Sequence, residues 1–185
     1  MRTIMLLAVL GIAVLLAGCV PSLHPLYTKQ DLVVDNKLVG TWSDEDLEET
    51  WVFKAASDKA YDLTLTSNGE PAEFETHLVR LGGATFLDMY PKETKGVKNE
   101  YYLLHLIPAH TFSRIKIDGD VLSVAMLDGT WLEDVIDEGI VKIAHEDVEE
   151  DIVLTASTPE LQKFLRKHAQ DDQAFEAPTE LRRKK

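Results

Sequence analysis

Histidine is the residue type in this sequence best suited to bind a metal ion, and the sequence has six of them. His105 and His110 are five residues apart. His77 shares a strand face with Glu73 and Glu75, because alternate residues of a strand point the same way. A catalytic zinc site needs three ligands around one ion, and no His-Glu-x-x-His spacing occurs. We expect no metal and no cofactor, and we expect Glu73, Glu75 and His77 to face solvent.

Asp88 places a carboxylate on a strand face that otherwise carries aromatic side chains, those of Phe86 and Tyr90. A lone buried charge is costly, so Asp88 needs either a partner or a cavity that reaches solvent. Arg80 and Arg114 are the candidate partners for an ion pair. The alternative is that Asp88 orients a ligand inside a cavity. The candidate pocket residues are then Asp88, Tyr90, His105 and His110.

Nucleophilic catalysis has little support in this sequence. None of its serines lies in a Gly-x-Ser-x-Gly elbow, and no glycine-rich phosphate loop is present. A hydrolase that uses His110 with a nearby carboxylate is the least favoured of three functional hypotheses. We expect that the protein is not an enzyme.

Cys19 is the only cysteine, and it ends an apolar run that begins at Ile4. The run is shorter than the roughly 20 apolar residues that a spanning helix needs. Arg2 is the only charge before it, and Ala17 and Gly18 are small, as a cleavage site requires. The stretch Leu16-Ala17-Gly18-Cys19 resembles the lipobox of bacterial lipoproteins.

This resemblance implies that residues 1–18 are a signal peptide and that Cys19 carries a diacylglyceryl thioether and an N-acyl group, with fatty chains such as palmitate. Such an anchor holds a domain at a membrane without a spanning helix. In Gram-negative lipoproteins an aspartate after the cysteine favours the inner membrane. If the host is Gram-negative, Val20 therefore favours the outer membrane, facing the periplasm. An ordinary signal peptide that ends near a cysteine is the alternative.

The negative charge of the chain excludes nucleic-acid binding. The chain has 32 acidic and 19 basic residues, a net charge of −13, and removal of residues 1–18 takes away only Arg2 and gives −14. Such a domain repels nucleic acid and anionic lipid. With its one thiol acylated the domain has no disulfide, so a packed core has to stabilise it.

Strand patterns dominate the sequence after Lys37. Residues 60–66 alternate between apolar and polar, and Asn68-Gly69 and Gly82-Gly83 are turn signals. The predicted strands are Leu38–Trp42, Thr50–Lys54, Ala60–Thr66, Glu73–Leu81, Ala84–Tyr90, Tyr101–Ile107, Thr111–Ile117 and Val121–Leu127, with short ones at Ile140–Ala144, Ile152–Thr155 and Glu180–Arg183.

Two segments change to helical spacing. Thr130–Glu138 places its apolar residues on one face and is followed by Gly139, a plausible stop. Thr158–His168 begins with Thr158 as N-cap and Pro159 in the first turn. We expect both helices to bury one apolar face against the strands.

Gly40-Thr41-Trp42 resembles the Gly-x-Trp signature of lipocalins and their calycin relatives. In those barrels the glycine allows a close backbone approach, and the tryptophan plugs the closed end. An arginine from near the C-terminus lies across the indole. The resemblance implies that Arg182 or Arg183 takes this position. It also implies an up-and-down barrel with a helix docked outside before a final short strand.

The expected fold is therefore mainly β with two helices, as an antiparallel up-and-down barrel similar to lipocalins; a partly open sheet or sandwich with packed helices is the alternative. Residues 19–37 form a lipidated tether, or an arm lying on the domain, and residues 38–185 form one β-rich domain. The expected function is a lipid-anchored cell-envelope protein that binds a small apolar or amphipathic ligand. The alternative is a structural lipoprotein that docks to another envelope protein. The oligomeric state stays open.

Overall fold

The structure is a computed structural model, and it describes residues 20–45, 48–57, 59–92, 99–103, 105–149 and 151–185. The predicted signal peptide and Cys19 lie outside these residues. Among the described helices, none combines the length and the apolar character needed to cross a bilayer.

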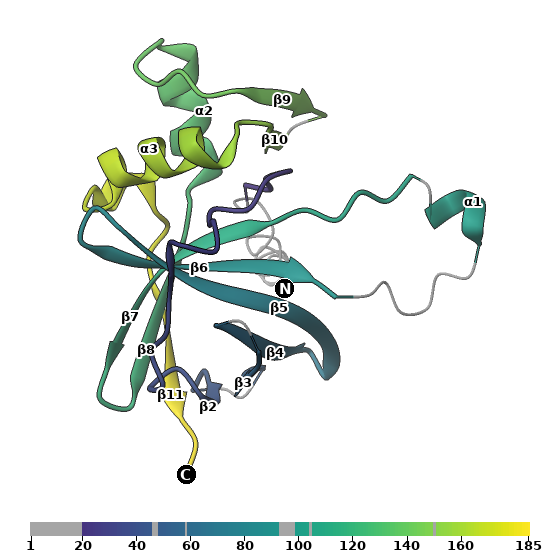
Figure 1. Ribbon diagram of the computed structural model, residues 1–185, viewed down its shortest axis with the longest axis vertical. Coiled ribbons are helices and arrows are strands. Elements are labelled where there is room, and N and C mark those ends of the chain that lie inside the picture. Colours follow the sequence, from purple (N-terminus) through teal and green to yellow (C-terminus); the bar gives the residue numbers. More distant parts are fainter. Residues whose placement is uncertain (1–19, 46–47, 58, 93–98, 104, 150) are drawn as a thin grey trace, which may run out of the picture.

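Eight antiparallel strands form a closed barrel (Figure 1). They are β2 (Gly40–Ser43), β3 (Glu49–Ala55), β4 (Ala60–Ser67), β5 (Glu70–Leu81), β6 (Ala84–Pro91), β7 (Thr111–Asp118), β8 (Val121–Met126) and β11 (Thr179–Arg183). The first seven follow one another in chain order, and β11 fills the place between β8 and β2. The predicted up-and-down barrel is confirmed.

Tight turns with positive φ join β4 to β5 and β5 to β6. Asn68 and Gly69 have φ values of 51° and 81°, and Gly82 and Gly83 have 57° and 84°. Two-residue hairpin turns of this kind need positive φ at both positions, which asparagine and glycine adopt most readily. The two turns predicted from the sequence are present, and they fix the register of three neighbouring strands.

The barrel interior is filled by side chains from alternate strand positions. Trp42, Phe53 and Tyr61 are among the largest fully buried side chains. They belong to one apolar cluster with Leu78 and Leu122. An eight-stranded barrel is just wide enough for side chains to fill, and here aromatic rings occupy that space.

A second layer covers part of the outer barrel face. It consists of α2 (Gly129–Asp137), the hairpin of β9 (His145–Val148) and β10 (Asp151–Leu154), α3 (Thr158–His168) and the 3₁₀ turn η1 (Asp172–Ala174), all inserted between β8 and β11. Val79 and Phe86 of the barrel cluster with Phe164 and Leu165 of α3. The core thus has one part inside the barrel and one part between barrel and helices.

The helix ends differ slightly from the predicted ones. Ser157, not Thr158, is the N-cap of α3, and it forms a capping box with Glu160. The Thr158 hydroxyl instead donates to the carbonyl oxygen of Pro25 at 2.7 Å. Asp128 caps α2 by accepting a hydrogen bond from the amide of Trp131.

Two predicted strands are wrong. Within 101–107 the structure has α1 (Glu100–Leu103) and irregular chain, because β6 pairs directly with β7 and leaves no place in the barrel for another strand. The segment Ile140–Ala144 is a connection, and the acidic stretch that follows it forms β9. A short apolar run does not by itself distinguish a strand from other buried chain.

Residues 20–37 form an arm that lies on the domain, which is the alternative to a tether. Val20, Ser22 and Leu26 are buried. Farther along, β1 (Leu32–Val33) pairs with Val79 and Leu78 of β5. The arm therefore runs over the outer face of the barrel to its end (Figure 1).

Candidate functional site

Arg183 is the arginine that covers Trp42. Its guanidinium carbon lies 4.0 Å from the centroid of the Trp42 ring. One guanidinium nitrogen donates to the carbonyl oxygen of Val39 at 2.9 Å. Gly40 has a φ of 138°, and a Cβ there would lie 2.5 Å from Nη1 of Arg183. The glycine therefore makes room for the cation–π contact, whereas Arg182 lies near Glu45 at the surface.

Asp88 is fully buried on the outer face of the barrel and has two hydrogen-bond partners. Its Oδ1 lies 2.7 Å from Nδ1 of His110, and its Oδ2 accepts the amide N–H of Leu26 at 2.7 Å. The Tyr90 ring lies 4.5 Å from the His110 ring, centroid to centroid. This polar cluster connects the arm to β6 and β7.

Neither arginine predicted as a partner of Asp88 has that role. Arg114 donates to the carboxylate of Asp172 at 2.8 Å and lies over the Phe175 ring. Asp88 pairs with His77 of β5, and Arg80 lies on the other face of that strand. Arg80 lines a pocket instead. The prediction failed because a backbone amide of the arm and a histidine satisfy the carboxylate.

His77 is buried rather than on a solvated face, because the Tyr27 ring lies over it at 4.1 Å between centroids. Burial lowers the pKa of His77; the Glu75 and Asp88 charges oppose this shift, and His110 adds to it. Burial, with smaller contributions from Asp88 and Glu75, raises the pKa of Tyr27 to about 12. The arm therefore covers a neutral imidazole with a neutral phenol.

The three histidines considered as metal ligands do not form one site. His77 and His110 lie near opposite sides of Asp88, whereas His105 is exposed beyond α1. Within the described parts of the chain, no group of three or more histidine, cysteine or acidic residues is placed to hold a metal ion.

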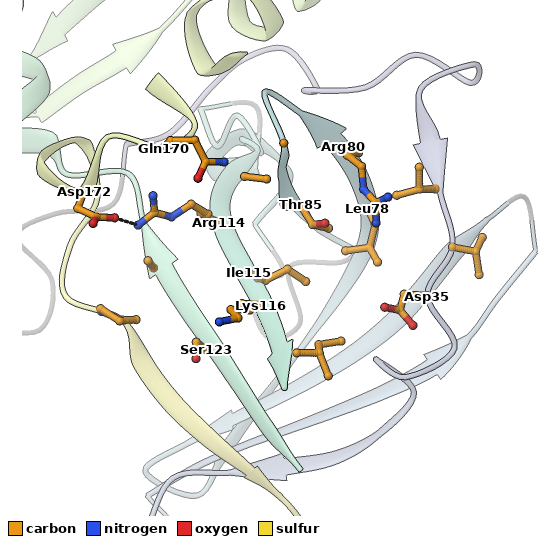
Figure 2. Close-up of a pocket in the computed structure, with 17 residues that line it drawn as sticks. Asp35, Leu78, Arg80, Thr85, Arg114, Ile115, Lys116, Ser123, Gln170 and Asp172 are labelled. Carbon is orange, nitrogen blue, oxygen red and sulfur yellow. Dashed lines mark hydrogen bonds and ion pairs between the residues drawn. The ribbon is translucent and has the colours of Figure 1, made fainter. Parts of the chain in front are cut away.

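A pocket of about 880 Å³ lies at the end of the barrel where β5 turns into β6 (Figure 2). Thr85 pairs with Ile115 in the last register position of β6 and β7, and β7 continues alone beside β8 to Asp118. The pocket occupies this gap and reaches both faces of β7. Leu78, Ile115 and Ile117 give it an apolar inner wall.

The charged residues of this pocket are mainly basic, unlike the chain as a whole. Arg80, Arg114 and Lys116 line it with Asp35 and Asp172. Asp172 is already paired with Arg114. Arg80 and Lys116 make no ion pair with any residue that the structure describes. The pocket therefore offers two cations without an ion pair among the described residues, and the carboxylate of Asp35, also without one, lies in the same lining.

The residues predicted for a ligand pocket lie elsewhere. Asp88, Tyr90 and His110 are together beneath the arm, and His105 is apart from them; none of the four lines the 880 Å³ pocket. Sequence reasoning considered Arg80 only as a partner of Asp88. Its place two residues after the inward-facing Leu78 is the signal that was available, since alternate residues share a face.

No family model, no curated protein and no solved structure matches the chain.

Proposed function

We propose that this protein is a cell-envelope lipoprotein, anchored through acylated Cys19, that binds a small amphipathic ligand. The proposal of an anchor is supported by the sequence Leu16-Ala17-Gly18-Cys19 after an apolar leader. In a Gram-negative host, Val20 favours the outer membrane, facing the periplasm.

The observation that carries the proposal of a ligand is the pocket at the barrel end. Its volume of about 880 Å³ is within the usual range for small-molecule sites. Val33 and Ile117 in its lining are partly exposed and suit an aliphatic chain, and Arg80 suits an anionic head group. An aliphatic acid is the simplest molecule that combines the two.

The buried Asp88–His110 pair supports a structural role rather than catalysis. The arm covers both side chains, and the carboxylate is used to hold the amide of Leu26. A reacting group has to reach a general base within hydrogen-bond distance, and the covered pair offers no such approach. We therefore propose no reaction for this protein.

Ligand binding is tested with decanoate and decanol, which have the same chain length and differ in charge. Decanoate is expected to bind more tightly. Arg80→Gln is expected to weaken decanoate binding about tenfold, because a hydrogen bond to a charged group contributes about 1.5–3 kcal/mol. Arg166→Gln, an exposed arginine of α3 outside the pocket, is the matched control. Equal affinity of both variants for decanoate would exclude this pocket.

The anchor is tested separately with Cys19→Ser in the native host. The variant is expected to lose palmitate labelling and to leave the membrane fraction, because serine has no thiol to acylate. A variant that still labels and still sediments with membranes would contradict the anchor but leave the pocket standing.

The filled barrel interior favours a second candidate function, which is docking to another envelope protein. Trp42, Phe53 and Tyr61 leave the centre of the barrel to side chains rather than a ligand. A photo-crosslinking residue at Thr85, in the pocket, separates the two candidates. Small-molecule adducts would support ligand binding, and a protein adduct would support docking.

A further inference from the structure

Exposed apolar side chains occur at the start of the arm and in the connection between β6 and β7. Seven large hydrophobic residues are exposed among the described residues, and four of them lie at the start of the arm or between β6 and β7. These four residues, which we call the loop surface, are Leu23, Tyr102, Leu106 and Ile107. Ile107 is 75% exposed and Tyr102 is 57% exposed. Contiguous exposed apolar side chains mark a contact with a partner or a membrane, and three of these four lie within one connection.

Backbone hydrogen bonds hold the start of the arm against the end of this loop. Ser22 and His110 exchange two backbone hydrogen bonds, each 2.8 Å long. Leu23 donates to the carbonyl oxygen of Leu154 at 2.9 Å. Ser22 follows Cys19 by three residues in the chain. An acylated Cys19 would therefore bring the bilayer close to the loop surface.

We propose that the loop surface inserts into the interface of the bilayer that anchors Cys19; this inference rests on the proposed lipid anchor. A bilayer fits better than a protein partner because the anchor fixes it beside these side chains. Isoleucine and leucine gain free energy by leaving water, and tyrosine is favoured at the level of the lipid head groups. Membrane attachment is stable when two signals act together, and the loop surface acts alongside the acyl chains.

The charge of the neighbouring hairpin defines the kind of lipid. The β9–β10 hairpin is joined to the arm through Leu154, and it exposes Glu146, Asp147 and Glu149. These carboxylates repel anionic head groups. The preferred surface is therefore zwitterionic.

Insertion of this loop fixes the direction in which the pocket opens. The connection from β6 to β7 carries α1 and lies at one end of the barrel (Figure 1). The turns after β5 and β7 lie at the other end, where Gly83, Lys116 and Ile117 line the pocket. A protein docked by its loop surface therefore presents the pocket away from the membrane.

The test uses the full chain, purified with its lipid and reconstituted into phosphatidylcholine vesicles. Since the lone Cys19 is acylated, Ile107→Cys supplies one free thiol for an environment-sensitive dye. The expected result is a blue shift on reconstitution and quenching by lipids that carry a nitroxide near the interface. The shift is expected to shrink when phosphatidylglycerol replaces part of the phosphatidylcholine.

Two labelled variants serve as controls. Ile140→Cys replaces another isoleucine, 59% exposed, that follows α2, and Asp118→Cys is at the turn after β7. Both dyes are expected to keep their emission in water. Protein that floats with vesicles while the Ile107 dye is unshifted would overturn the loop insertion and leave the anchor intact. Protein that does not float would overturn both, and a shift that needs added envelope proteins would overturn the bilayer as partner.

Discussion

The amide of Leu26 donates a hydrogen bond to the Asp88 carboxylate over 2.7 Å, joining residues 62 positions apart in the chain. The second carboxylate oxygen binds His110. A buried carboxylate with both oxygens engaged stabilises the folded state only while its partners stay in place. The arm and the barrel are therefore one cooperative unit.

Asp88→Asn is expected to lower the free energy of unfolding by about 1–3 kcal/mol, because one buried donor loses its acceptor. Urea denaturation measures the change, and hydrogen exchange at the Leu26 amide should speed up. Asp62→Asn is the control: Asp62 pairs with Lys92 at the surface, where a salt bridge contributes about 0–1 kcal/mol. Equal losses in both variants would contradict the role of Asp88.

His77 makes stability depend on pH. Its pKa in the folded protein is below the ordinary value of about 6.5, so the unfolded chain binds a proton more readily. The free energy of unfolding should therefore be highest above about pH 6.5 and fall as the pH drops below it. His77→Gln should flatten the fall, while His105→Gln, at an exposed position, should not. Thermal unfolding from pH 8 to pH 5 tests this, and an unchanged slope in His77→Gln would refute it.

Gly40→Ala should disturb the contact between Arg183 and Trp42. The added Cβ would meet Nη1 of Arg183 at 2.5 Å, and the backbone at φ 138° disfavours a side chain. We expect a loss of more than about 1 kcal/mol and a shifted Trp42 signal in near-UV circular dichroism. In Gly69→Ala the added Cβ meets nothing within 4 Å, so only backbone strain should appear.

Gly82→Ala should separate the β5–β6 turn from α3. Its Cβ would lie 2.6 Å from the carbonyl oxygen of Arg166 and 2.6 Å from Cβ of Ala169. Gly119→Ala has a similar φ, 60° against 57°, with no atom within 4 Å. Backbone strain costs about 1–2 kcal/mol in each, so the excess loss in Gly82→Ala measures the contact with α3. Chemical denaturation measures the loss of unfolding free energy in each variant. Equal losses would show that α3 moves aside for the added Cβ without cost.

The parts of the fold that depend on local sequence could be predicted. Asn68-Gly69 and Gly82-Gly83 define their turns because few other residues adopt positive φ. The alternation of apolar and polar residues from Ala60 to Thr66 identifies a strand, because successive side chains of a strand point to opposite faces. Trp42 with Arg183 was reached through a family resemblance, since nothing local to either residue indicates the other.

The parts that depend on tertiary contacts could not be predicted. Leu26 holds Asp88 through its backbone amide, which every residue except proline possesses. His77 follows the strand pattern of a solvated face, on which Glu73 and Glu75 are indeed exposed, but Tyr27 of the arm covers His77. The pocket exists because β7 extends past the end of β6. The residue pattern of one strand does not show where its neighbour ends.

Because β11 lies between β8 and β2, the barrel closes only after the last strand of the chain has paired. No ring can form until residues near the C-terminus meet strand β2 from near the start of the domain, and such distant pairings are slow to assemble. Until then β2 and β8 both present bare edges on which other chains can polymerise. Shortening the chain past Thr179 makes that exposure permanent, so affinity tags belong after Lys185 rather than in place of the last strand.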